Sequence, residues 1–207
     1  MESYKVPYRP RYPKEGYHIG SVSLTLGKHF ETFGGRRGYG KTIEVMPLSF
    51  REYYSLFYRE FFPLKAKEIL KGYLETGGYL AYFNSNLKAE DIIGFLKADI
   101  RALERSTDIA KEVMGAILDE APSPISFNSI AREVGISPRT AREYVELFEN
   151  LRVLKQVLYL VGDGKVYPRK ERKLILRDSL LVKVMELWTR RKVERAVIYE
   201  WLVQEHL

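Results

Sequence analysis

Cysteine is absent from the chain, which excludes disulfide bonds, thiolate metal sites and a thiol nucleophile. Only three histidines occur, His18, His29 and His206, and their separation does not match the spacing of metal ligands. No apolar run approaches the 18 residues of a membrane span, and no signal peptide is visible. We therefore expect a cytoplasmic protein with no membrane partner, no metal and no cofactor.

The composition that remains suits a folded, basic protein. Of the 207 residues, 45% are hydrophobic and 13% aromatic, which is enough apolar material for a core. The formal net charge is +7, which permits nucleic acid, nucleotides or acidic proteins as partners. The lack of cysteine beside abundant Lys, Glu, Arg and Tyr favours a thermophilic source.

The first half of the chain predicts an irregular leader followed by a helical connector. Residues 1–48 begin with a segment rich in Pro and Tyr with mixed charge and then show two short strand-like stretches, read as remnant strands. Ser49 and Glu52 form the S-x-x-E capping box of a helix start. Helical periodicity then predicts helices over 50–62, 65–74 and 89–105, so that the connector spans 49–106.

The second half predicts a winged helix-turn-helix over 107–178. Helical patterns cover 107–119, 127–134 and 138–151, with Gly135 in the sharp turn, Ser137 as N-cap and Pro138 at the first helical position. Two strand-like runs, 153–161 and 165–178, flank the turn "GDG" and read as a β-hairpin wing. Residues 179–207 predict C-terminal helices broken near "WTRRK". The expected fold class is mainly α, with a small hairpin.

One motif imitates a nucleotide site. Residues 35–42, "GRRGYGKT", satisfy the phosphate-loop pattern, with Lys41 in the position that contacts phosphate. A working loop needs a buried strand before it and a helix starting at its end, and neither pattern flanks this one. "GAILDE" resembles a Mg²⁺-binding strand end, but Asp119 and Glu120 close a helical pattern. We expect a basic glycine-rich loop, with ATP binding through Gly35–Thr42 as the alternative.

Several segments resemble the archaeal AAA-type ATPases that carry a C-terminal winged-helix region. They are "GSVS", "PLSFREYYSLF", "YLETGGYLAYF", "IAREVGISPRTAREYVELFENLRVL" and "VERAVIYEWLVQEHL", in the family's order, from about residue 19 to the end. The resemblance implies that Ser21 occupies the position that senses the γ-phosphate. It also implies that Arg36 or Arg37 senses nucleotide or reaches a neighbouring subunit.

The same resemblance places "GRRGYGKT" beyond the family's own phosphate loop and Mg²⁺ carboxylate, which would precede Met1. The family often continues into a nuclease-like domain, of which Glu194 would be at most the first acidic residue. It therefore implies a fragment without catalytic activity of its own.

Two binding functions remain open for the winged helix. Arg139 and Arg142 fall near the start of its second helix, where DNA bases or phosphates are met. Glu143, Glu146 and Glu149 on that helix oppose phosphate, which leaves protein docking to a full-length ATPase or to a second copy as the alternative. The wing adds cations suited to phosphate contact: Lys165, Arg169, Lys170, Arg172 and Lys173.

Overall fold

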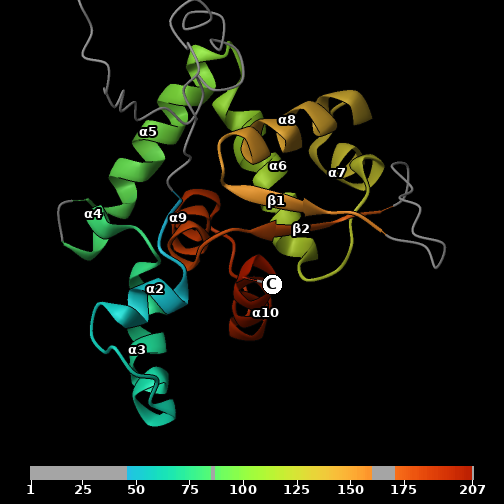
Figure 1. Cartoon of the computed structure of the whole chain (residues 1–207). Helices are drawn as coiled ribbons and strands as arrows, with labels where there is room; N and C mark the ends of the chain where they lie inside the picture. The colour runs from blue at the N-terminus through green and yellow to red at the C-terminus, as the bar shows by residue number, and fades with distance from the viewer. Residues whose placement is uncertain (1–45, 85–86, 160–170, 207) are drawn as a thin grey trace, which may run out of the picture.

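The computed structural model describes residues 46–84, 87–159 and 171–206, and these are mainly α-helical with one two-stranded antiparallel sheet (Figure 1). This confirms the predicted fold class. The expected leader strands and the "GDG" turn lie outside the described residues. In chain order the elements are α2 Phe50–Ser55, α3 Pro63–Thr76, α4 Leu80–Phe83, α5 Ala89–Ala102, α6 Thr107–Glu120, α7 Phe127–Val134, α8 Pro138–Asn150, β1 Leu154–Val157, β2 Lys173–Leu176, α9 Ser179–Thr189 and α10 Arg195–His206.

Serine hydroxyls cap four of the described helices, α2, α6, α7 and α8, and the sequence predicts two of these caps, Ser49 and Ser137. The Ser49 hydroxyl accepts the Glu52 N–H, and the Glu52 carboxylate accepts the Ser49 N–H, which confirms the capping box. Ser137 accepts the Thr140 N–H at 3.0 Å and caps α8. Gly135 closes α7 with φ of 75°, a left-handed conformation that glycine adopts without a side-chain clash.

The first predicted helix is shorter than its sequence pattern, because α2 ends at Ser55 instead of continuing to residue 62. A loop follows that is closed by the Tyr54 hydroxyl, which donates to the Glu60 carbonyl and accepts the Phe62 N–H at 2.9 Å. Pro63 then starts α3, since proline suits the first position of a helix. The run of aromatic residues therefore folds as a helix and a loop.

The winged helix consists of α6, α7, α8 and the β1–β2 hairpin. The strands pair in register from Leu154 opposite Leu176 to Val157 opposite Lys173. Ile125, between α6 and α7, forms an isolated antiparallel bridge with Arg172, which extends the sheet by a third short segment. This bridge fixes the start of α7 to the base of the wing.

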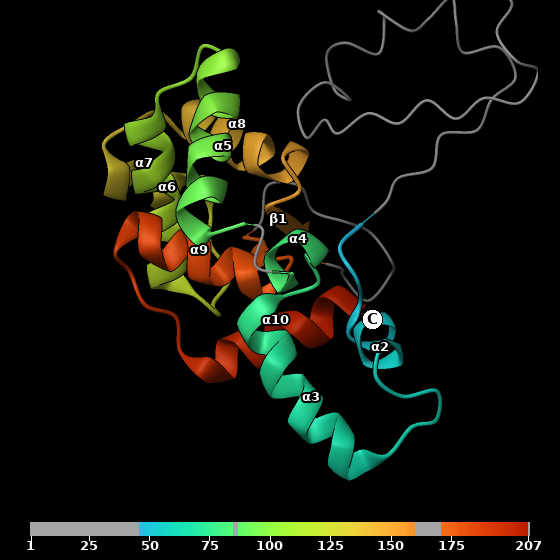
Figure 2. The ribbon, with the colours of Figure 1, turned by 90° about the vertical axis from the view of Figure 1, so that its left-hand side faces the viewer.

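One hydrophobic core joins α5 through α10. Figures 1 and 2 show α8 on one side of the hairpin and α10 on the other, with α9 beside α5 and α6. Burial of each large apolar side chain contributes about 1.5–3 kcal/mol, so this core is the main source of stability. Its most buried large side chains are Ile100, Met114, Ile130, Val145, Phe148, Leu154, Ile175, Leu180, Met185 and Trp201.

The segment 46–79, which we call the arm, has a separate aromatic cluster. Tyr53, Tyr54 and Tyr73 are buried but do not belong to the core of α5–α10. The Tyr53 and Tyr73 rings meet edge to face at 5.1 Å. Figure 2 shows α3 projecting away from the α5–α10 body, so the arm is attached chiefly at one end.

Candidate nucleic-acid interface

The outward face of α8 presents two arginines. Ala141, Val145 and Phe148 are fully buried on the opposite face, and this fixes the rotation of the helix. The Arg139 side chain is 90% exposed and that of Arg142 is 64% exposed. The structure therefore places both predicted contact residues at the solvent surface of the N-terminal half of α8.

Nearby cations pair with two of the glutamates of α8. The Glu143 carboxylate lies 3.2 Å from Arg139 Nε and 2.9 Å from an Arg105 guanidinium nitrogen. The Glu146 carboxylate lies 2.8 Å from Arg142 Nε. These pairs reduce the net negative field of the helix.

The third glutamate of α8 points toward the hairpin. Glu149 accepts the backbone N–H of Gln156 at 3.2 Å and the Gln156 side-chain amide at 2.7 Å. Its carboxylate thus holds α8 against β1. Of the three glutamates, it is the one whose hydrogen bonds serve the fold of the wing.

Arg172 is buried at the base of the wing. It is 8% exposed, and its guanidinium carbon lies 3.9 Å from the centre of the Phe127 ring. The guanidinium also donates to the Gln156 side-chain oxygen, and burial lowers the pKa of Arg172. This predicted phosphate contact therefore stabilises the junction of α7 and the hairpin, because its side chain turns inward.

Glutamates of α10 face the cations of the hairpin. Lys173 forms an ion pair with Glu200, and its side chain is 23% exposed. Arg177 and Lys155 both pair with Glu205, at 2.7 and 3.6 Å. The ammonium group of Lys173 is thus paired with a glutamate of α10. Three other cations of the predicted wing, Lys165, Arg169 and Lys170, lie outside the described residues.

The nucleotide-site residues of the sequence analysis also fall outside the described part of the chain: Ser21, Arg36, Arg37 and Lys41, within the stretch that holds Gly35–Thr42. Asp119 and Glu120 end α6 and are exposed, and Asp119 pairs with Arg191 at 3.1 Å. That position is a solvated helix end, as the periodicity predicts.

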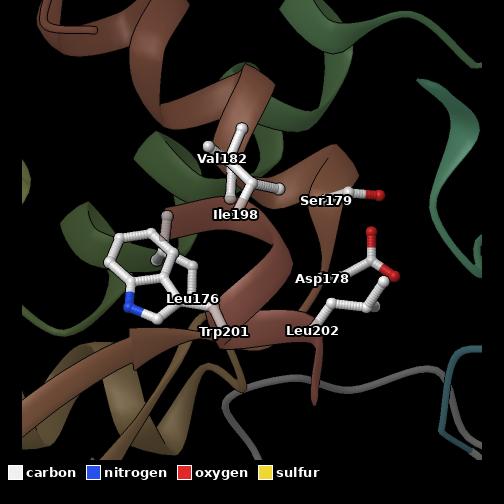
Figure 3. A pocket seen from close by; sticks show the side chains of 7 residues that line it. All are labelled: Leu176, Asp178, Ser179, Val182, Ile198, Trp201 and Leu202. Carbon is white, nitrogen blue, oxygen red and sulfur yellow. The ribbon is translucent and has the colours of Figure 1, made fainter. Parts of the chain in front are cut away.

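A buried carboxylate that sequence reasoning missed lies between the arm and α9. Asp178 is 4% exposed, caps α9 by accepting the Leu180 N–H, and also accepts the Gly78 N–H. Burial raises the pKa of Asp178 to about 6, although its backbone hydrogen bonds act in the opposite direction. Figure 3 shows Asp178 and Ser179 beside the narrow gap between α9 and α10, which has no room for a water molecule.

The described residues bring together no group of His, Asp and Glu that could hold a metal ion. Among the described helices, none combines the length and apolar character needed to cross a membrane.

Comparison with known proteins gives one family match. The sequence pattern of the family described as "Domain of unknown function (DUF8612)" matches residues 67–192, more than half of the chain. The match runs from within α3 to just beyond α9 and leaves out α2 and α10. No curated protein and no solved structure matches.

Proposed function

The chain belongs to the DUF8612 family, whose function is unknown, and we propose from its surface that its winged helix binds duplex DNA. The observation that carries the proposal is the exposure of Arg139 and Arg142 on the outward face of α8. In helix-turn-helix proteins the N-terminal residues of this helix contact the major groove.

Two features of α8 favour phosphate at its N-terminal end. Its first turn contains no acidic residue, and the helix dipole is positive there. The exposed Arg–Glu pairs on the helix are worth only about 0.3–0.5 kcal/mol each, so a DNA phosphate can replace the glutamate as partner at little cost. The glutamates therefore weaken the interface without blocking it.

The resemblance to archaeal AAA-type ATPases suggests the kind of system in which this winged helix would bind DNA. We propose that this winged helix is the DNA-directed part of such a cytoplasmic system, without catalytic activity of its own. An ATPase subunit would then be the partner that supplies nucleotide hydrolysis.

Fluorescence anisotropy with a labelled DNA duplex at 50–200 mM salt tests the proposal. We expect measurable binding by the wild type. When Arg139 and Arg142 are both changed to Ala, the slope of log K against log salt concentration should decrease in magnitude by about two, since each lost phosphate contact removes about 0.9. The matched control changes Arg51 and Lys67, two exposed cations of the arm, to Ala. Absence of binding at 50 mM salt, or an equal loss in the control, would disprove the proposal.

Protein docking is a second candidate, favoured by the exposed apolar side chains of residues 56–64. Phe61 is 68% exposed and Leu64 is 84% exposed, and both lie beside cations such as Arg59 and Lys65. Exposed apolar side chains that cluster mark contact sites. The occupant that we propose is a second copy of this chain.

Light scattering after size exclusion measures that association directly. A dimer that dissociates when Phe61 and Leu64 are changed to Ser, but not when the exposed Leu187 of α9 is changed to Ser, supports self-docking. A monomer at all concentrations rejects it.

A further inference from the structure

Three chain segments meet where the arm joins α9. Leu48 donates its N–H to the Gly78 carbonyl at 2.9 Å, and Gly78 donates its own N–H to the Asp178 carboxylate at 2.8 Å. The Tyr73 hydroxyl donates to the Leu48 carbonyl at 2.8 Å, and the Ser179 hydroxyl donates to the Tyr73 carbonyl at 2.8 Å. Residues far apart in sequence thus close one continuous hydrogen-bonded junction.

The two glycines of this junction have no room for a side chain. A Cβ at Gly77 would lie 1.9 Å from Asp178 Oδ1, and Gly77 has a φ of 63°. A Cβ at Gly78 would lie 2.1 Å from the Leu48 carbonyl oxygen. Each glycine therefore permits a different close approach, one to α9 and one to the segment before α2.

Apolar packing also attaches the arm, since Tyr79 lies against the core of α5–α10. The arm packs its aromatic cluster on itself, since α2 lies against α3, and α3 in turn lies against α9. Its buried tyrosines are not part of the core that joins α5 to α10. One further polar contact, from the Lys183 ammonium to the Glu75 carbonyl at 2.8 Å, is at the surface. The junction is thus the main polar connection between the arm and the winged-helix body.

We infer that Leu48, Gly77, Gly78 and Asp178 form a latch that opens as one unit, releasing the arm from α9 while α5–α10 remain folded. With the latch closed, the arm and the winged helix move together. With the latch open, they move independently. The inference does not depend on DNA binding.

The balance of forces at Asp178 favours a latch that opens. Three backbone N–H groups stabilise its carboxylate, those of Gly78, Leu180 and Leu181, whereas burial and the nearby Glu205 of α10 disfavour the charge. The other titratable groups that face it are Tyr73 of α3 and Tyr79 before α4. Opening the latch hydrates the buried carboxylate of Asp178, and this hydration offsets part of the free energy that is lost with its hydrogen bonds.

Native-state hydrogen exchange on the full chain tests the latch. We expect the amides of Leu48 and Gly78 to exchange together with the amides of α3, at least about tenfold faster than the slowest amides of α6 and α8. Changing Gly78 to Ala is expected to accelerate exchange in the arm about a hundredfold, with the amides of α6 and α8 unchanged. The control is Gly94→Ala in α5, where a Cβ meets nothing within 4 Å.

Two results would overturn the inference. The first is wild-type exchange in which the arm and α6–α8 open with one common rate, because the arm would then unfold only with the whole molecule. The second is unchanged arm exchange in Gly78→Ala. If that variant does not fold, Asp178→Asn replaces it. The Asn side chain has a single oxygen, which can accept either the N–H of the α9 cap or the Gly78 N–H, and its amide donor then faces the other N–H. The same selective acceleration of the arm is then required.

Discussion

The buried carboxylate of Asp178 makes folding stability depend on pH in a direction opposite to that of most acidic side chains. Its pKa is about 6 in the folded protein, raised from 3.8 by burial. The folded state binds the Asp178 proton more tightly than the unfolded state does, so protonated Asp178 contributes fully to the free energy of unfolding below pH 3.8. This contribution is lost as the pH rises to about 6. The difference between the two pKa values corresponds to about 3 kcal/mol, at about 1.4 kcal/mol per pH unit.

Urea unfolding of the wild type and Asp178→Asn between pH 4 and 7.5 measures this effect. The variant lacks the titrating group but also loses a hydrogen bond, which shifts its stability by a constant amount. We expect the stability of the wild type relative to the variant to fall by up to about 3 kcal/mol from pH 4 to pH 7. Asp108→Asn, which removes an exposed carboxylate at the start of α6, controls for net charge. If wild type and Asp178→Asn give parallel curves, the assignment of a raised pKa to Asp178 is refuted.

Three further variants test the winged helix, each by urea unfolding. Ser137→Ala removes the N-cap of α8 and is expected to cost about 1 kcal/mol, with Ser55→Ala at the end of α2 as the exposed comparison. Phe148→Ala, at a position with no exposed surface, is expected to cost about 3–5 kcal/mol, and a loss below about 1 kcal/mol would contradict the packing described above. Arg172→Ala is expected to cost about 1–3 kcal/mol because it removes the stacking on Phe127 and a part-buried hydrogen bond to Gln156. An unaltered stability would show that the guanidinium does not support the wing.

The helix-turn-helix could be predicted because its signals are local. Ser137, Pro138 and Gly135 mark helix ends through the conformation of a few neighbouring residues, and the structure confirms them. The inner stripe of α8 follows from helical spacing, which fixes the buried face without knowledge of what covers it. The boundaries of the proposed domains, at 48, 106 and 178, remain predictions.

The parts that could not be predicted depend on contacts distant in sequence. Asp178 and Gly78 are 100 residues apart, and nothing near either residue indicates the other. Arg172 and Lys173 are adjacent cations that point to different surroundings, one under Phe127 and one toward Glu200 of α10. Counting charge in the wing gave both residues the same role. The position of α10, which decides the environment of Lys173, has no local signal.

The burial of Trp201 limits where the chain can be cut into fragments without disrupting its core. Its indole is 1% exposed within the common core, yet α10 lies beyond the stretch that is shared with the family. A fragment cut at residues 67 and 192 would leave an unfilled space against β2 and α9, and would expose apolar surface to water. A fragment from 87 to 206 would instead keep every buried side chain of that core. The unit that shares one buried core is therefore offset from the unit of sequence relatedness, and borders drawn by similarity alone would divide that core.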